Sequence, residues 1–251
     1  MKKILLDIRN LNAFIGKKQI IKNLDLVIKE SEIHVIMGPN GSGKSSLSKI
    51  LAGHPSYNIT NSLLVFNGNN LLEIPPEIRS HQGLFVGFQY PIEIPGLTNF
   101  EFLRVIYNEK EKQLQKSIVG PIDFMRIIQP ILLKLKINEE FLNRSLNHEF
   151  SGGEKKRNEI LQMILLKPKL SVLDEIDSGL DIDTMNIIVN NLKTGNNNKS
   201  SIIVISHYPS FIKLLKPTYI HVMLKGTIYK TGNLELLDFI EHNGFKEFAQ
   251  K

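Results

Sequence analysis

The alternation of apolar and polar positions along this 251-residue chain predicts several β-strands. Short β-branched and aliphatic runs, or strict alternation of apolar with polar residues, are typical of strands in a packed sheet. Such runs lie at 4–11, 20–28, 33–37, 63–67, 84–88, 170–173, 202–205 and 219–224. The run at 33–37 is almost wholly apolar, which is typical of a parallel strand buried on both faces.

Between 98 and 166 the spacing of apolar residues becomes helical. Two sets each define one apolar face: Phe100, Leu103, Ile106 and Tyr107, and then Phe124, Ile127, Ile128 and Ile131. Another helix is predicted at 234–240. The pattern indicates a single α/β domain, in which an α/β lobe (1–97 and 167–251) is interrupted by a helical subdomain (98–166).

Composition narrows the range of partners. The formal charge is +6, but Lys and Arg are spread along the chain, so a solvated basic surface is favoured over a nucleic-acid groove. No apolar stretch has the length of a membrane span and no signal peptide is seen, so we expect a soluble protein. Without cysteine, the chain has no thiolate for a disulfide or an iron–sulfur cluster. The scarcity of alanine beside abundant Ile, Asn and Lys, as at 196–199, favours an AT-rich organelle genome or a low-GC bacterium.

The most informative motif follows the 33–37 strand and precedes a predicted helix at 46–52. It reads G-x-x-x-x-G-K-S, and the predicted nucleotide-binding residues are Gly38, Pro39, Asn40, Gly41, Ser42, Gly43, Lys44, Ser45 and Ser46. A strand, a glycine-rich loop and a helix N-terminus in this order form a phosphate cradle. Lys44 is expected to reach the β- and γ-phosphates of ATP, and Ser45 to bind Mg²⁺. A glycine-rich turn with a chance lysine is the alternative, and both flanks argue against it.

Two carboxylates end the strand predicted at 170–173. Asp174 is placed to hold Mg²⁺, and Glu175 to act on the attacking water. Alternatively, the pair caps the following helix. The P-loop favours the metal-and-base interpretation.

A Ser-Gly-Gly segment followed by Glu154 and an apolar helix predicts a second anion-binding helix N-terminus. The residues concerned are Ser151, Gly152, Gly153 and Glu154. Alone, Ser-Gly-Gly is a weak motif and usually only a turn. Here it lies between the P-loop and the acidic pair, in a chain that also carries Gln89 and His207.

Together these motifs resemble the ATPase subunits of the ABC superfamily. The resemblance covers essentially the whole chain and implies a P-loop NTPase fold with a mixed or parallel core sheet, an antiparallel β subdomain and an inserted helical subdomain. It also implies ATP hydrolysis with Mg²⁺ held by Ser45, Gln89 and Asp174. Glu175, His207 and Gln89 are the implied catalytic residues. Asp181 and the Ser-Gly-Gly segment would contribute to the nucleotide site of a second subunit in an ATP-dependent homodimer.

His207 has a second interpretation, as a structural histidine at a strand end; the order of motifs favours contact with the γ-phosphate.

Within that superfamily, the segments 88–96, 150–163, 174–183 and 206–208 are similar to the SufC family of iron–sulfur cluster assembly ATPases. That resemblance implies soluble SufB- and SufD-like scaffold partners and, with the composition, a plastid stroma or a bacterial cytoplasm. Where the family more often has a small polar residue, this chain has Ile176, which predicts different packing after Glu175.

The apolar residues after Gln89 have two interpretations of equal weight. Either they form an apolar partner patch, or they are core residues of the helical lobe. These residues are Tyr90, Ile92, Ile94 and Leu97.

Three other functions remain open at this stage. An ABC membrane transporter subunit would have the same hydrolytic site but a membrane-spanning partner. A nucleotide-gated nucleic-acid binder would need a contiguous basic groove, coiled-coil arms or a second cassette. A nucleotide-binding structural subunit without turnover is opposed by the intact set Lys44, Asp174, Glu175 and His207.

Overall fold

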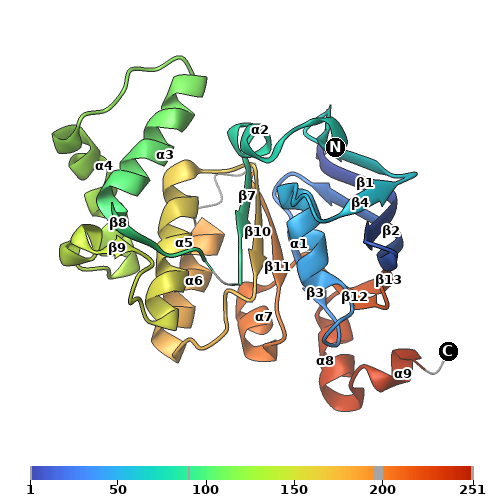
Figure 1. Ribbon diagram of the computed structural model, residues 1–251. Coiled ribbons are helices and arrows are strands. Elements are labelled where there is room, and N and C mark those ends of the chain that lie inside the picture. The colour runs from blue at the N-terminus through green and yellow to red at the C-terminus, as the bar shows by residue number, and fades with distance from the viewer. Residues whose placement is uncertain (1, 90, 195–199, 250–251) are drawn as a thin grey trace. The chain divides into compact units, whose positions relative to one another are not determined.

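The computed structural model describes residues 2–89, 91–194 and 200–249. It divides the chain into two compact units, each made of more than one segment (Figure 1). The first unit comprises Met1–Phe88, Lys169–Ile176 and Asn196–Lys251, and the second comprises Gln89–Pro168 and Asp177–Gly195. The division predicted from the sequence placed 89–97 and 177–195 in the α/β lobe, whereas the structure groups them with the second unit. The assignment of functions to the two lobes remains a prediction.

The first unit contains a six-stranded mixed sheet. Its order is β13 (Thr227–Gly232), β12 (Tyr219–Leu224), β3 (Ile33–Met37), β11 (Ser201–Ile205), β10 (Leu170–Asp174) and β7 (Leu84–Gly87). The pairs from β12 to β7 are parallel, and only β13 pairs antiparallel with its neighbour. Every residue of β10 and β11 is buried, which explains their continuous apolar runs.

A second sheet of the same unit is antiparallel. Its order is β2 (Lys18–Lys29), β1 (Ile4–Ile15), β5 (Leu63–Phe66) and β6 (Asn69–Asn70), with β4 (Asn58–Thr60) also paired to β1. The long strands β1 and β2 alternate buried and exposed positions along much of their length. Their inward side chains, such as Leu6 and Ile28, share one core with Leu47 and Ile203. The predicted α/β fold, with its antiparallel part, is confirmed.

Helices complete the first unit: α1 (Lys44–Ala52), the short 3₁₀ helix η1 (Leu71–Glu73), α2 (Pro76–His81), α7 (Pro209–Leu215), α8 (Leu234–Asn243) and α9 (Lys246–Ala249). Proline at the first helical turn starts α2 and α7, where its missing N–H costs nothing. Asn233 caps α8, because its side chain accepts from the N–H of Glu235 at 3.0 Å.

The second unit is mostly helical. It contains β8 (Ile94–Thr98), α3 (Asn99–Gln113), α4 (Pro121–Leu135), η2 (Glu139–Asn143), β9 (Ser145–Leu146), α5 (Gly152–Leu166) and α6 (Ile182–Thr194). The predicted apolar faces are formed, with Leu103, Phe124 and Ile128 fully buried. The helical pattern predicted from about 98 to 166 corresponds to α3, α4 and α5, and the short elements η2 and β9 lie between α4 and α5. β9 pairs with β8 through Thr98, whose hydroxyl also caps α3.

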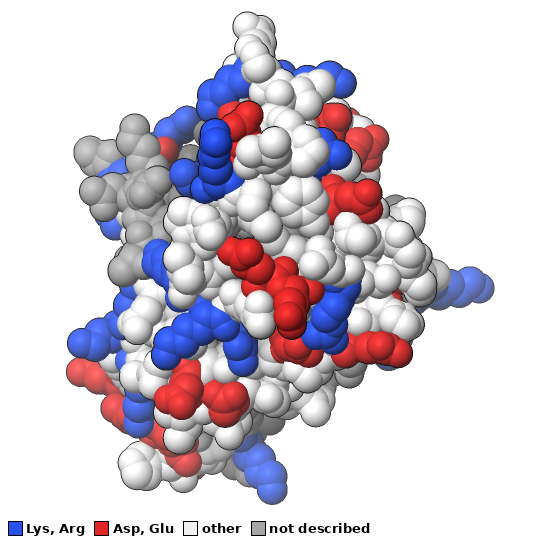
Figure 2. All heavy atoms as spheres, turned by 90° about the vertical axis from the view of Figure 1, so that its left-hand side faces the viewer, with Lys and Arg blue, Asp and Glu red and all other residues white. Residues whose placement is uncertain are grey.

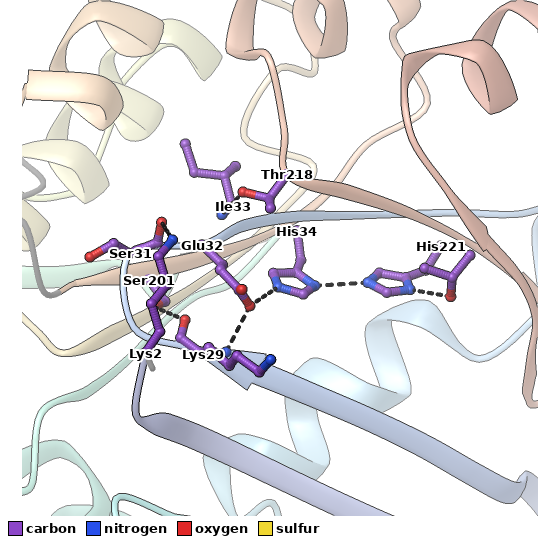
Figure 3. Close-up of polar contacts among 10 residues, drawn as sticks. Lys2, Lys29, Ser31, Glu32, Ile33, His34, Ser201, Thr218 and His221 are labelled. Atoms are coloured by element: carbon purple, nitrogen blue, oxygen red, sulfur yellow. Dashed lines mark hydrogen bonds and ion pairs between the residues drawn. The ribbon is translucent and has the colours of Figure 1, made fainter.

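A buried polar chain crosses from β3 to β13 in the first unit (Figure 3). His34 lies between Glu32 and His221, with its Nε2 3.1 Å from Glu32 Oε2 and its Nδ1 2.8 Å from His221 Nε2. The Nδ1 of His221 is 2.8 Å from Thr231 Oγ1, and the backbone N–H of Lys29 donates to Glu32. The two imidazoles are 1% and 4% exposed. One proton arrangement satisfies every link: Thr231 donates to His221, His221 to His34, and His34 to Glu32.

Candidate functional site

The P-loop is shaped by glycines where no side chain fits. Gly38, Gly41 and Gly43 have φ of 155°, 77° and 108°. A Cβ on Gly38 would collide with the carbonyl oxygen of Met223, and one on Gly43 would lie 2.9 Å from the Met223 Cε. The loop therefore approaches β12 closely, and Gly43 passes directly into α1. Among the described residues no side chain caps α1, so its first N–H groups are left for an anion.

Lys44 is 5% exposed and bends back over the loop. Its Nζ donates to the carbonyl oxygens of Gly38 at 2.8 Å and Pro39 at 3.0 Å. Burial lowers the pKa of Lys44, and the nearby carboxylates of Glu175 and Asp174 oppose that shift. The ammonium is held at the mouth of the loop by acceptors that a phosphate can replace.

Asp174, at the end of β10, is joined to the P-loop helix through Ser48. The Ser48 hydroxyl lies 3.1 Å from Asp174 Oδ2 and 2.9 Å from the Ser45 carbonyl oxygen, and its one proton serves one acceptor at a time. Asp174 is 3% exposed and Ser48 is fully buried. Sequence reasoning missed Ser48, although it lies three residues after Ser45 on the helix and so faces the same way.

Glu175 directly follows β10 with a left-handed backbone, φ 52°, which turns the chain sharply at the end of the strand. Its N–H donates to the Ile205 carbonyl oxygen at 2.9 Å, and the next side chain, Ile176, is 1% exposed. This packing turns the Glu175 carboxylate toward His207, whose Nε2 is 3.9 Å from Glu175 Oε1.

His207 follows β11 and is partly buried. Burial lowers the pKa of His207, the positive charge of Lys44 lowers it further, and Glu175 opposes both. The imidazole is therefore neutral near pH 7. Its Nε2 is buried and, among the described residues, has no hydrogen-bond partner.

These features fit a magnesium-bound triphosphate. Like His207 Nε2, the Ser42 hydroxyl is buried and has no hydrogen-bond partner within the described part of the chain. A bound phosphate could supply a partner for both groups. The Ser45 hydroxyl and the Asp174 carboxylate are the hard oxygen donors that Mg²⁺ prefers. Among the described residues no cluster of three His, Cys, Asp or Glu provides an all-protein metal site.

The Ser-Gly-Gly segment begins α5 in the second unit. Ser151 is the N-cap: its hydroxyl accepts from the Glu154 N–H at 3.2 Å, and Glu154 Oε2 accepts from the Ser151 N–H at 2.8 Å. Arg144 holds the other oxygen of Glu154 at 2.6 Å. Burial opposes ionisation of Glu154, but the hydrogen bonds from Ser151 and Arg144 outweigh it and lower its pKa. Glu154 thus shapes the helix start, while Ser151 and Gly152 are exposed.

Gln89 and Asp181 also belong to the second unit. Gln89 is partly buried, and its carbonyl oxygen accepts from Lys156 Nζ at 3.4 Å. The Asp181 carboxylate accepts from the N–H of Thr184 at 2.7 Å and from its hydroxyl at 3.0 Å. Within one unit the structure thus brings together the P-loop, Asp174, Glu175 and His207, whereas Gln89, Asp181 and the Ser-Gly-Gly segment belong to the other unit.

Two of the four apolar residues named after Gln89 are exposed and so are not core residues of the helical lobe. Ile92 is 77% exposed and Ile94 is 39% exposed. Leu97 is partly buried, and Tyr90 lies outside the described residues. The interpretation as ordinary core is therefore wrong for Ile92 and Ile94.

A parallel sheet whose strand ends carry a phosphate-binding loop, an aspartate and a glutamate defines a P-loop NTPase. Residues 21–178 match the ABC transporter family. The chain is 52% identical to "Probable ATP-dependent transporter ycf16" of Trieres chinensis, with 96% of each chain covered. It is 47% identical to "Probable ATP-dependent transporter slr0075" of Synechocystis sp., covering 98% of this chain and 96% of that one. The third relative, "ABC transporter I family member 6, chloroplastic" of Arabidopsis thaliana, is 44% identical, with 98% and 73% covered.

Solved structures share the fold. An ATP-binding subunit of an ABC transporter superposes with a TM-score of 0.80 at 21% identity, with 98% of each chain covered. The ATP-binding cassette MJ0796, solved as a dimer bound to ADP and Pi, gives 0.79 at 22% identity, with 92% of this chain and 99% of that one covered. The chain belongs to the ABC transporter ATPase family, and it is an ATP-binding ATPase. None of the helices described here is long and apolar enough to cross a bilayer.

Proposed function

We propose that the nucleotide is bound and cleaved by the residues gathered at the ends of β3, β10 and β11. In this proposal the P-loop amides and the Ser42 hydroxyl bind the phosphates, and Lys44 exchanges its two carbonyl contacts for the β- and γ-phosphates. Ser45 and Asp174 would hold Mg²⁺, which supplies charge neutralisation on the phosphate oxygens. Gln89 would complete its coordination. The link from Asp174 through Ser48 to the P-loop helix is the observation that carries the proposal, because it fixes the metal-binding carboxylate against the phosphate cradle.

Glu175 then orients and polarises the attacking water. Its left-handed backbone and its position 3.9 Å from His207 support this role, since both groups face the same point beyond β10 and β11. The neutral His207 has a free Nε2 with which to donate to the γ-phosphate once its proton is on that nitrogen. The proton from water passes to Glu175, and the phosphate oxygens are stabilised by fixed donors rather than by a covalent intermediate.

The Ser-Gly-Gly segment, here called the signature segment, would bind the nucleotide held by a second copy of the chain. Ser151 and Gly152 are exposed, and they lie at a helix N-terminus whose internal capping fixes the backbone amides in place. Asp181 is exposed in the loop before α6. An ATP-dependent two-fold dimer, with each copy's signature segment over the other's nucleotide, uses all three. MJ0796 was solved as a dimer, which supports this arrangement.

We infer that the partner is a protein scaffold of the SufB and SufD type, and that ATP turnover drives its conformational change during iron–sulfur cluster assembly. The support is the similarity of the segments 88–96, 150–163, 174–183 and 206–208 to the SufC family. The chain has no cysteine, so cluster ligation would lie with the scaffold. Relatives named as chloroplastic or from Synechocystis, together with the AT-rich composition, favour a plastid stroma or a bacterial cytoplasm.

The surface is consistent with a protein partner rather than nucleic acid. On the face seen in Figure 2, Lys and Arg side chains are interspersed with Asp and Glu, and no continuous basic groove crosses it. The alternative is the nucleotide-binding subunit of a membrane transporter, which the names of several relatives favour.

Co-purification separates the two. The tagged chain is isolated from its native compartment with and without Ile92→Lys and Ile94→Lys. A SufB- or SufD-like scaffold lost from the double variant supports the proposal. Capture of a membrane-spanning partner instead contradicts the assembly role. Full retention of the scaffold by the double variant contradicts the apolar partner patch. Lys193→Gln, far along the chain in α6, is the control.

A further inference from the structure

The second unit contains a pocket that the proposed ATPase function does not use. Its volume is about 340 Å³. The residues that matter for its chemistry are Lys136, Glu140, Phe141, Arg144, Glu154 and Arg157. They come from the end of α4, from η2 and from the first turns of α5, so the pocket is built against the signature helix.

The pocket has an aromatic base and an exposed rim. Phe141 is 7% exposed and packs on Phe150, with ring centroids 4.4 Å apart, while the Arg144 guanidinium lies 4.5 Å from the Phe150 ring centroid. At the rim, Lys136 and Glu140 are exposed. Lys136 ends α4 in a left-handed conformation, φ 53°. An incoming side chain would contact the Phe141 ring, which Phe150 supports from behind, and the charged side chains around it.

The charges of the pocket are not balanced. Arg144 and Glu154 neutralise each other at 2.6 Å. Lys136 and Arg157 then face a single remaining carboxylate, Glu140. Arg157 donates from Nη2 to Thr184 Oγ1 at 3.2 Å, but its Nε is buried and, within the described residues, has no hydrogen-bond partner. A buried guanidinium N–H without an acceptor costs free energy that a bound anion would recover.

We propose that this pocket binds the carboxylate of an Asp or Glu side chain presented by a partner protein. A carboxylate supplies the acceptor that Arg157 Nε lacks and offsets the excess positive charge, and its methylene groups can pack on Phe141. The volume is ample for one side chain, and the exposed residues Lys136 and Glu140 leave the pocket accessible to a protein surface. The pocket is thus an anchor for one acidic residue at the edge of an interface.

Two hydrogen-bonded connections lead from the pocket to nucleotide-facing motifs. On one wall, Arg144 binds Glu154, which caps the backbone at Ser151. On the other wall, Arg157 binds the Thr184 hydroxyl, which donates to Asp181. A carboxylate bound at Arg157 Nε would shift the guanidinium whose Nη2 donates to Thr184, and would so alter the support of Asp181. The binding step stands alone, whereas its effect on turnover rests on the proposed dimeric site.

Binding is tested on the full-length, ¹⁵N-labelled chain by NMR titration. The probes are N-acetyl-glutamate N-methylamide, the matching glutamine compound and inorganic phosphate. The glutamate compound is expected to give saturable shifts of the Arg157 Nε–H and the Phe141 amide, with weak affinity because the ligand is small. Equal binding of the glutamine compound, or tighter binding of phosphate at the same resonances, overturns the proposal.

Two lysines of the same region provide a matched pair. Lys136→Gln is expected to weaken binding of the glutamate compound about threefold, as for a partly exposed charge pair, and to leave basal ATP hydrolysis unchanged. Lys134→Gln removes the same charge from α4 but does not line the pocket, so its affinity should equal that of the wild type. Equal weakening by both would show a general charge effect and refute a specific site.

Thr184→Val tests the connection to Asp181. It removes the hydroxyl between Arg157 and Asp181 while leaving the pocket side chains in place. The variant should bind the glutamate compound as the wild type does but lose the ligand-induced shift of the Asp181 amide. If that shift persists, the connection is wrong. These readouts need no hydrolysis, so their failure is distinct from failure of the ATPase proposal.

Discussion

Lowering the pH is expected to destabilise the first unit through the buried histidine pair. Burial lowers the pKa of His221 to about 3, with a smaller contribution from His34, and burial also lowers the pKa of His34. In the folded chain burial penalises a second proton on either ring, and a charge on one imidazole would lie beside the other ring of the stacked pair (Figure 3). Glu32 is the one carboxylate of this chain of contacts, and it already accepts from His34 and Lys29.

The sign and size follow from proton linkage. The unfolded chain binds a proton on His221 below a pKa of about 6.5, whereas the folded chain does so only near 3, so stability falls as pH drops between these values. From pH 7.5 to pH 5 the loss from His221 alone is about 2 kcal/mol. His34 adds to it in the same direction.

Urea unfolding at both pH values measures this loss. His221→Gln keeps a donor for His34 and an acceptor for Thr231 but does not titrate, so the variant should lose about 2 kcal/mol less than the wild type on acidification. The exposed His81→Gln is the control, and its pH dependence should match the wild type. Equal pH dependence in His221→Gln and wild type, or an NMR titration of His221 with a midpoint near 6.5, would refute the linkage.

Three further substitutions test the nucleotide site. Glu175→Gln should retain ATP binding but lower turnover at least about 100-fold, since it removes the group that acts on water; unchanged steady-state hydrolysis contradicts the assignment. Lys44→Ala should weaken ATP binding about 10- to 100-fold through loss of charged hydrogen bonds, as measured by equilibrium titration; wild-type affinity would argue against it. Ser48→Ala should raise the magnesium concentration for half-maximal hydrolysis about tenfold, because Asp174 loses its hydrogen bond to Ser48. Ser210→Ala, on an exposed surface, is the control. An equal magnesium dependence in Ser48→Ala and wild type speaks against the Ser48 link.

The elements that the sequence predicted best are those buried on both faces. The strands at 33–37 and 219–224 have the predicted bounds, because continuous apolar runs have few competing structures. The two-residue strands β6 and β9 and the short β4 were missed, because two or three residues are too few to show an apolar–polar alternation. Strand β13 was missed because its pattern is mostly exposed and polar. In the site, glycine spacing indicated the P-loop, and the Thr184–Asp181 contact joins residues three apart. Nothing local points to the pairing of Arg144 with Glu154 or of Arg157 with Thr184, because these partners are 10 and 27 residues apart.

The order of the parallel strands explains the spacing along the chain of the residues proposed for catalysis. In the register of the sheet, Asp174 lies opposite Ile205, and Ile205 lies opposite Ile36. Because β10, β11 and β3 run parallel, their carboxyl ends reach the same edge, and the residues that follow each strand meet there. The P-loop, Glu175 and His207 are therefore neighbours although more than a hundred residues separate the first from the others. A one-residue slip of β10 against β11 would turn Asp174 to the opposite face and leave Glu175 in its place, so the buried side chains that fix this register are as necessary to the site as the carboxylates themselves.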